Sequence, residues 1–293
     1  MQDWEQQRGY FAAIATAPVT WLLIFFMVPL AIVWAYSFGQ NTGLTTIEIS
    51  GTFSNYARSI EPLYLEIFLK SVAVAALTTL ICLIVGFPVA MAISFAKDKW
   101  KPWLLLLIML PFWTNLLIRT YALLSVLGTR GFANQGIEWV MVHLNLTTAQ
   151  DFQPWPLLYN NFAVILGLVY VHLPFMVLPL YAALDRLDKS LIEASLDLGA
   201  GHWTTITRIV APLAAPGIIS GLIITFVPAL GAYLTPDLMG GTDSQMIANV
   251  IERQFKRAND WPFGAALSFM LMYATFILIA LQALRNKKIE GRT

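Results

Sequence analysis

The chain has 293 residues, of which 58% are hydrophobic and 12% are charged, and its formal net charge is +1. Soluble domains are typically about 45–50% apolar and about 25% charged, so this composition indicates a membrane protein. The lysines and arginines are few and scattered, which excludes a nucleic-acid partner. The three histidines are isolated, so we expect no metal site.

Six stretches are long and apolar enough to cross a bilayer, for which a helix needs about 20 residues. No stretch alternates polar and apolar residues over about ten positions, which argues against a membrane β-barrel. The sequence therefore predicts an all-α, polytopic protein with six transmembrane helices in a single transmembrane domain, residues 1–293. The expected spans are approximately residues 14–38, 71–96, 103–127, 161–184, 213–235 and 264–284.

The orientation follows from the excess of Lys and Arg on cytoplasmic loops. Eleven of these residues lie in one set of flanking segments and six in the other, and Arg119 lies within the third span. This bias predicts that both termini are cytoplasmic. The segment 185–212, between the fourth and fifth spans, then faces the cytoplasm.

Arg119 and Asn115 lie one helical turn apart in the third span. A charge within a span is costly and is a candidate for function. If the span ends near residue 120, however, Arg119 extends to the outer interface or forms a structural pair. Both interpretations remain open from the sequence.

The cytoplasmic segment begins with a predicted helix over residues 186–198. Its apolar residues recur at intervals of three and four, which forms one stripe along a helix. Gly199 and Gly201 are expected to end this helix, and "HWTTITRIV" predicts a second short helix. The stripe consists of Leu187, Leu191, Ala194 and Leu198.

A helix of this kind could lie on lipid headgroups, but such helices usually carry Lys and Arg. Here Glu193 and Asp197 lie four residues apart on the same side. Anionic lipid would repel both carboxylates. The pattern therefore favours docking into a groove on another protein.

The fifth span contains Pro228, which frees a backbone carbonyl and weakens the helix. Broken helices are typical of transporter solute paths, although a packing kink explains the proline equally well. Tyr233 and Asp237 follow at the outward end. Asp237 either attracts a cation or caps a helix end.

One pattern runs through this segment: Glu193-Ala194-Ser195, then Gly199 after three residues, Ile209 after nine more and Pro212 after two more. This pattern resembles the EAA loop of ABC importer permeases, whose consensus is E-A-A-x3-G-x9-I-x-L-P. Ser195 and Ala211 depart from that consensus. The resemblance implies a type I ABC importer permease fold whose loop docks on a separate ATPase subunit. The implied coupling residues are Glu193, Ala194, Ser195, Asp197, Gly199, Ile209 and Pro212, with Glu193 meeting donor groups on the ATPase and Gly199 permitting the turn.

None of the eight lysines follows a glycine, so the chain lacks the phosphate-binding motif G-x4-G-K-[ST]. We therefore expect no cofactor on this chain and no enzymatic activity of its own. ATP and Mg²⁺ are expected on the partner.

Four further stretches are similar to the spermidine/putrescine permeases of the PotB/PotH type: "LPFWTNLLIRTYALLSVLGTRG", "LGLVYVHLPFMVLPLYAALDRLDKSLIEAS", "VPALGAYLTPDLMGG" and "DWPFGAA". This similarity implies import of a polyamine or a related cationic or amino-acid-like solute from periplasm to cytoplasm. It also implies a bacterial inner-membrane location. The implied partners are two ABC ATPase subunits, a second homologous permease and a periplasmic solute-binding protein.

Several side chains are candidates for the solute pathway. Aromatic rings could stack on an ammonium group, although aromatic residues near span ends are more often interface anchors. Asp237 and Asp260 could raise the local cation concentration on the outer side. The full set of pathway candidates is Trp113, Asn115, Arg119, Tyr121, Tyr170, Pro228, Tyr233 and Asp237.

Two other classes remain as alternatives. A secondary transporter or channel would usually carry ion-coupling carboxylates inside its spans, whereas all seventeen acidic residues fall in loops or at span ends. An intramembrane enzyme would need convergent Asp, His or Ser groups, and the sequence offers only scattered ones.

Overall fold

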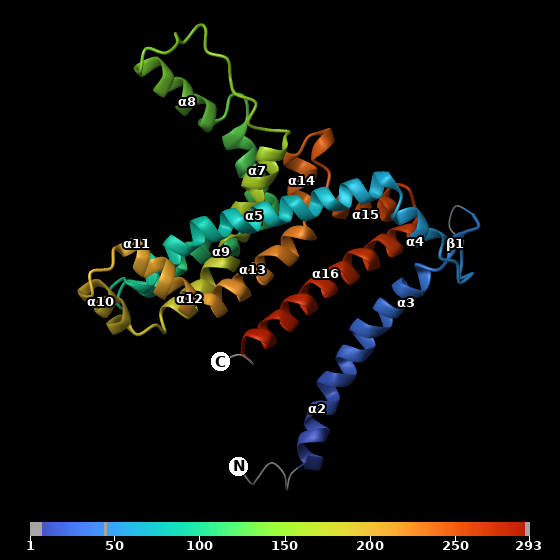
Figure 1. Ribbon diagram of the computed structural model, residues 1–293. Coiled ribbons are helices and arrows are strands. Elements are labelled where there is room, and N and C mark those ends of the chain that lie inside the picture. The colour runs from blue at the N-terminus through green and yellow to red at the C-terminus, as the bar shows by residue number, and fades with distance from the viewer. Residues whose placement is uncertain (1–7, 44–45, 291–293) are drawn as a thin grey trace. The chain divides into compact units, whose positions relative to one another are not determined.

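The long helix α9, Asn161–Leu184, is the centre of the larger of two compact units in this chain. A computed structural model describes the backbone of residues 8–43 and 46–290, and the side chains of residues 14–43 and 46–280. Unit 1 consists of Met1–Leu65 with Val250–Thr293, and unit 2 of Glu66–Asn249. Figure 1 shows the elements of both. The single transmembrane domain expected from the sequence stays a prediction.

Unit 1 contains the first and last predicted spans. Its helices α2, α3, α4 and α16 cover Arg8–Leu22, Val28–Tyr36, Ser54–Ser59 and Trp261–Glu290, and a π-helical turn, η1, covers Leu23–Met27. Strands β1, Gln40–Asn41, and β2, Ile47–Glu48, form an antiparallel pair in which Gln40 lies opposite Glu48. The indole Nε1 of Trp34 donates to the hydroxyl of Tyr273 at 2.9 Å, which joins α3 to α16.

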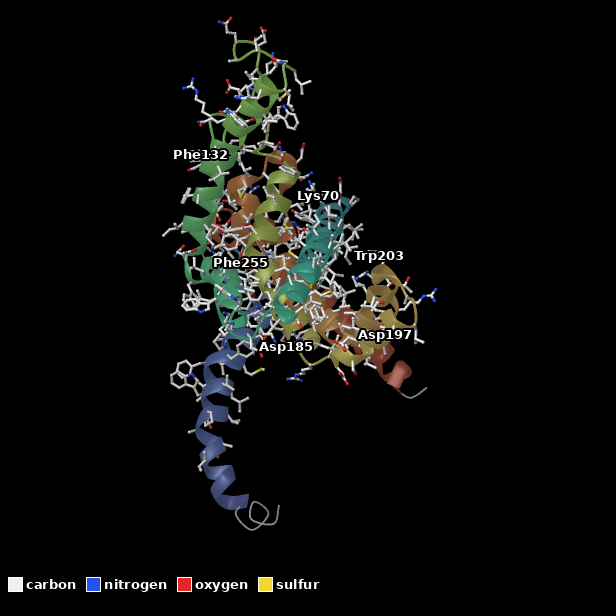
Figure 2. The ribbon with its side chains drawn as sticks, turned by 90° about the vertical axis from the view of Figure 1, so that its left-hand side faces the viewer. Lys70, Phe132, Asp185, Asp197, Trp203 and Phe255 are labelled. Atoms are coloured by element: carbon white, nitrogen blue, oxygen red, sulfur yellow. The ribbon has the colours of Figure 1, made fainter. Side chains whose placement is uncertain are left out.

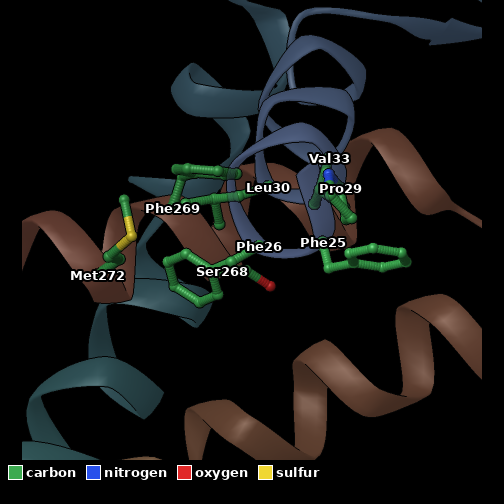
Figure 3. Close-up of a pocket in the computed structure, with 8 residues that line it drawn as sticks. All are labelled: Phe25, Phe26, Pro29, Leu30, Val33, Ser268, Phe269 and Met272. Atoms are coloured by element: carbon green, nitrogen blue, oxygen red, sulfur yellow. The ribbon is translucent and has the colours of Figure 1, made fainter. Parts of the chain in front are cut away.

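An open cavity of about 330 Å³ lies between η1–α3 and α16 (Figure 3). Its lining is apolar except for Ser268, whose hydroxyl already donates to Gly264 O at 2.8 Å. Because this lining is apolar, the cavity offers no polar site for a charged solute. None of the predicted pathway residues lies in it. The other lining residues are Phe25, Phe26, Pro29, Leu30, Val33, Phe269 and Met272.

Unit 2 is built from helices α5 to α14. They are α5 Pro62–Ser94, which begins in unit 1, α6 Lys101–Met109, α7 Leu116–Leu127, α8 Phe132–His143, α9, α10 Lys189–Asp197, α11 His202–Thr205, α12 Ala211–Leu213, α13 Ala215–Leu230 and α14 Leu234–Met239. Short 3₁₀ or π turns are η2 Leu110–Trp113, η3 Ile206–Val210 and η4 Thr242–Ser244. Helix α15, Ile247–Lys256, continues from unit 2 into unit 1.

The core of unit 2 is formed where α5, α9 and the start of α13 meet. Its buried side chains come from α5, α9 and the η3–α12 segment that leads into α13, and include Cys82, Ile93, Met176, Leu180, Leu184, Val210 and Ala214. Glycines make the contact between α9 and α13 close, because a Cβ at Gly217 would lie 2.4 Å from Ala183 Cβ. Since Cys82 is buried among apolar residues, it belongs to this core, as its sequence context suggests.

The described residues contain four helices that are long and apolar enough to cross a membrane, and six spans if each of two bent pairs counts as one. The uninterrupted spans are Ile14–Tyr36, Pro62–Ser94, Asn161–Leu184 and Trp261–Ala280. They agree with four of the expected spans, although α5 begins nine residues before position 71. The other two expected spans are present as bent pairs of helices, so the number of six is reached when each pair counts as one span.

The third expected span, residues 103–127, is bent by 93° between Lys101–Trp113 and Leu116–His143. Thr114 has extended backbone with ψ 151°, which ends η2. The side chain of Asn115 then accepts a hydrogen bond from Leu117 N at 2.8 Å and caps α7. A new helix therefore starts at this point, as expected for an asparagine N-cap.

The fifth expected span, residues 213–235, is also interrupted. Helices α12 and α13 are separated at Ala214, where the segment bends by 71°. Pro212 and Pro216 have no N–H to continue the backbone ladder across this bend. Helix α13 continues through Pro228 and ends at Leu230, so Pro228 does not break the span at its middle. Tyr233 precedes a separate short helix, α14.

Candidate functional site

The segment between the fourth and fifth spans forms a helical hairpin, which consists of α10, a glycine turn and α11–η3. The carboxylate of Asp188 accepts a hydrogen bond from Ser190 N at 3.0 Å and caps α10. This bond from the Ser190 N–H lowers the pKa of the Asp188 carboxyl. Because the cap fixes the first turn, α10 starts at Lys189, three residues after the predicted start at residue 186.

Gly199 closes the hairpin turn with a left-handed backbone, φ +82°. Its N–H donates to Leu196 O at 2.9 Å, and Ala200 N–H donates to Ser195 O at 3.1 Å. This pair of bonds is the Schellman motif, in which glycine is favoured after a helix C-terminus. The prediction that Gly199 ends the helix is confirmed. Gly201 instead has φ −70° and precedes α11.

Ser195 and Thr205 join the two arms of the hairpin. Their hydroxyl oxygens lie 3.0 Å apart, and both residues are buried. Thr205 Oγ1 also donates to Gly201 O at 3.2 Å, so the Ser195 hydroxyl is the donor to Thr205. The serine that departs from the EAA consensus therefore forms a hydrogen bond that an alanine cannot form.

The predicted apolar stripe does not face inward as one surface. Leu187 packs against the core of unit 2, whereas Leu191 is 47% exposed and Leu198 is 88% exposed. The inward-facing side of α10 carries Ile192, Ser195 and Leu196 instead. As a result, most of the stripe lies on the outside of the hairpin.

The exposed side of the hairpin combines apolar and acidic groups. Trp203 on α11 is 77% exposed, and Glu193 and Asp197 on α10 are exposed as well. Figure 2 shows Asp197 and Trp203 at the same end of unit 2 as Asp185, and Phe132 of α8 at the opposite end. We call Leu191, Ala194, Leu198 and Trp203 the hairpin patch.

An ion-pair cluster lies at the base of the hairpin. The ammonium of Lys101, at the start of α6, lies 2.9 Å from Asp98 Oδ1 and 2.9 Å from Asp185 Oδ1, just after α9. The hydrogen bond from Lys101 lowers the pKa of the Asp98 carboxyl. This cluster ties α6 to the segment that leads into α10.

The last two residues of the predicted motif lie where the hairpin returns to the membrane part. Ile209 is half-buried in η3, next to the buried core residue Val210, and Pro212 is exposed at the start of α12. The motif therefore extends from the exposed turn to the core of unit 2.

The pathway candidates do not form one cluster through any contact between described residues. Trp113 is 72% exposed at the end of η2, Tyr121 is 56% exposed on α7, and Tyr170 is 39% exposed on α9. Asn115 acts as the N-cap of α7. Their role in a solute pathway stays a prediction.

Asp237 is exposed in the first turn of α14 and is not its N-cap, since Tyr233 occupies that position. The backbone oxygen of Tyr233 accepts a hydrogen bond from Asn249 Nδ2 at 2.8 Å. Asp260, the second acid expected to attract cations, lies in unit 1 and accepts from Arg58 Nη1 at 2.9 Å. Asp260 is thus already paired.

Arg119 does not extend into solvent, because the whole residue is only 9% exposed. Its guanidinium carbon lies 5.8 Å from the centre of the Phe112 ring. Sequence reasoning did not identify Phe112, Lys101, Trp203 or Thr205, since their roles depend on the bend and on the hairpin turn. Among the described residues, no group of three or more His, Cys, Asp or Glu side chains could hold a metal ion.

The helical fold with bent spans and a capped helical hairpin between the fourth and fifth spans is that of a membrane permease of the ABC importer class. Residues 7–291 match the family described as binding-protein-dependent transport system inner membrane component, and the chain belongs to this family.

Known relatives agree with this class. The chain is 41% identical over 276 residues to the spermidine/putrescine transport system permease protein PotB of Escherichia coli K12, covering 93% of this chain and 98% of that protein. It is 37% identical to PotB of Haemophilus influenzae, with 92% and 93% covered. A chain in the crystal structure of a bacterial ABC transporter that imports the acidic polysaccharide alginate has the same fold, with TM-score 0.75, 15% identity and 98% of both chains covered.

Proposed function

We propose that this permease imports a polyamine, such as spermidine or putrescine, or a related cationic solute, from periplasm to cytoplasm. The support for this substrate is the 41% identity with PotB over 93% of the chain. The substrate would be delivered by a periplasmic solute-binding protein and would cross between this chain and a second homologous permease. Both termini would lie in the cytoplasm.

The hairpin patch is the observation that carries the coupling mechanism. A side chain as apolar as Leu198 at 88% exposure favours burial against a partner protein, since burial of apolar surface stabilises association. Trp203 adds an aromatic ring, a residue type that is enriched at the energetic centres of interfaces. We propose that two ATPase subunits serve the complex and that one of them receives this patch in a groove.

Glu193 and Asp197 would set the orientation of that docking. Both carboxylates are exposed next to the patch, so basic side chains or backbone N–H groups on the ATPase would pair with them. ATP and Mg²⁺ would bind on the ATPase subunits, and no cofactor would bind on this chain. When the ATPase dimer closes, the hairpin would move with it and tilt the core of unit 2 through Ile209 and Pro212.

On the outer side, Asp237 would attract the cationic solute. The exposed rings of Trp113, Tyr121 and Tyr170 would contact its ammonium groups, together with Tyr233 near the α13–α14 junction. The outward carboxylate supports this assignment, because negative charge at a pathway entrance concentrates cations. Arg119, Asn115 and Pro228 would shape the path rather than bind the solute.

The test is purification of the tagged chain from native membranes, with ATPase activity assayed in the eluate. We compare the wild type with Leu198→Asp, and use Leu144→Asp as the matched control, since Leu144 is 63% exposed outside the hairpin. Loss of co-purified ATPase in Leu198→Asp alone supports the docking assignment. Wild-type chain that elutes without an ATPase and still transports in vesicles overturns the proposed coupling in favour of a secondary transporter.

The substrate is tested separately in proteoliposomes that contain the whole complex. Radiolabelled spermidine and putrescine should be taken up in an ATP-dependent manner, and excess unlabelled polyamine should compete. Competition by a neutral sugar, but not by spermidine, would contradict the assignment.

A further inference from the structure

Arg119 is a buried cation whose charge is not compensated by the described part of the chain. The residue is 9% exposed, and its Nε atom is buried without a hydrogen-bond partner. Its guanidinium forms no ion pair with the described residues, and the group that it faces is the Phe112 ring. A buried charge without a partner is strongly unfavourable.

The position of Arg119 in the fold makes this cost larger. It is the fourth residue of α7, so it lies at a helix N-terminus, where the macrodipole disfavours positive charge. His172 lies within electrostatic range of Arg119 and is also buried. Its Nδ1–H donates to Leu168 O at 2.8 Å, and an imidazole carries no negative charge that could neutralise the guanidinium.

The site lies far from either end of α9. His172 is the twelfth residue of this 24-residue helix, and its ring centre is 6.1 Å from that of Phe175. Phe175 in turn packs edge-on against Phe112, with ring centres 5.3 Å apart. Arg119 is therefore connected to the middle of α9 through aromatic rings, and lipid headgroups cannot supply its counter-ion at that depth.

We propose that Arg119 receives a carboxylate from a membrane span of a second, non-identical permease subunit. A second copy of this chain offers no acid at that depth, because the only Asp or Glu residues in its described spans are Glu66 and Glu138, which lie near the ends of Pro62–Ser94 and Leu116–His143. The helix face that carries Arg119 is open to a neighbouring helix, since Asn115 and Ala122, one turn before and one turn after it, are exposed. A guanidinium also presents several donors in one plane, which suits a carboxylate.

This inference rests on the proposed function, which supplies the second permease and a cationic solute. A cationic solute would be repelled by Arg119 and is not its ligand. The ion pair would instead join the two permeases at the break between η2 and α7. It would fix the orientation of α7 relative to the neighbouring subunit.

The experiment uses the whole complex, with this chain tagged and co-expressed with the second permease of its transport system. Arg119→Met is compared with Arg130→Met, since Arg130 is exposed just beyond α7. We expect Arg119→Met to reduce co-purified second permease by about tenfold or more, because the partner's acid is left unpaired, and Arg130→Met to leave it unchanged. Normal recovery of the second permease with Arg119→Met overturns the proposal.

The same assay, with this chain left intact, then scans each intramembrane Asp and Glu of the second permease as Asn or Gln. One such variant should reproduce the loss, and combining it with Arg119→Met should add little further loss, as expected for a coupled pair. This scan decides the proposal even if Arg119→Met is not recovered from membranes, because the absence of any sensitive acid overturns it. If the wild-type chain brings down ATPase but no acid matters, the proposed function stands and only the ion pair is wrong.

Discussion

The Ser195 hydroxyl donates to Thr205 Oγ1 across 3.0 Å, and Thr205 donates in turn to Gly201 O. These two bonds link α10, the glycine turn and α11 in one buried chain. These bonds hold the two arms of the hairpin together, as the proposed transmission of force from an ATPase requires.

The order of these donors predicts unequal effects of two substitutions. Ser195→Ala removes one hydrogen bond and leaves Thr205 bonded to Gly201, so we expect a loss of about 1 kcal/mol. Thr205→Val leaves the buried Ser195 hydroxyl without its acceptor, which costs about 1–3 kcal/mol. Thermal unfolding of the purified chain in detergent measures both. The double variant should be more stable than Thr205→Val, and an inverted order would contradict the donor assignment.

Gly199 and Gly201 differ in backbone conformation, which allows a matched test of the turn. Gly199 has φ +82°, and a Cβ added there would meet no atom within 4 Å, so a side chain at this position is strained by conformation and not by contact. Gly199→Ala should cost about 1–2 kcal/mol, the penalty for a left-handed L-residue. Gly201→Ala, at φ −70°, should be close to neutral. Equal melting temperatures for the two variants would contradict the Schellman turn.

Two other glycines test the packing of α9 against α13. A Cβ at Gly217 would lie 2.7 Å from Pro179 O, whereas a Cβ at Gly136, inside α8, meets nothing within 4 Å. Gly217→Ala should separate the helices and destabilise the chain by about 1–3 kcal/mol. Gly136→Ala should be neutral or stabilising by up to about 1 kcal/mol, because alanine favours a helix. Unfolding in detergent distinguishes the two, and tolerance of Gly217→Ala would mean that the helices are not in close contact.

Asp237 and Asp260 have separate expected roles. Asp237→Asn should reduce spermidine uptake several-fold at low ionic strength and much less at high salt, since an exposed charge attracts the solute only over about a Debye length. Asp260→Asn should instead weaken unit 1, because Asp260 pairs with Arg58, whose guanidinium lies 3.9 Å from the Phe263 ring centre. Uptake of a neutral solute reduced equally by Asp237→Asn would contradict the electrostatic role.

Composition and periodicity predict much of this architecture. The four uninterrupted spans are apolar over their full length, and the glycine at position 199 marks a true helix end. The bends at Thr114 and Ala214 were not predicted, because an apolar stretch has the same composition whether its helix is straight or broken. A break depends on single residues, such as the Asn115 cap, whose effect a long hydropathy window averages out.

The hairpin shows a similar limit. The spacing of Leu191, Ala194 and Leu198 predicts a stripe but does not say whether the stripe faces the core or solvent. Tertiary contacts decide this, since Ile192 and Leu187 occupy the core side. The pairing of Asp260 with Arg58 spans 202 residues and has no local signal in the sequence.

Lys101 connects the start of α6 to the end of α9, and this link predicts an effect on coupling rather than on stability. Ion pairs that reach solvent contribute little to stability, and both carboxylates here do so while the Lys101 side chain is 16% exposed, so Lys101→Met should lower the melting temperature only slightly. If the link transmits movement of the hairpin to α6, the reconstituted complex should keep its ATPase activity and lose most uptake. Lys99→Met is the matched control, and the exchange Lys101→Asp with Asp185→Lys should restore part of the uptake.

The pH dependence of this link follows from the carboxyl pKa. Lys101 lowers the pKa of Asp98 below its ordinary value, near 3.9, so the stabilisation is present above that value and is lost as pH falls through the lowered pKa. Because the Asp98 carboxylate stays ionised between about pH 5 and 8, this cluster should not change the ratio of uptake to ATP hydrolysis in that range. A parallel fall of ATPase activity and uptake in Lys101→Met would contradict a coupling role, because it would place the defect in assembly with the ATPase.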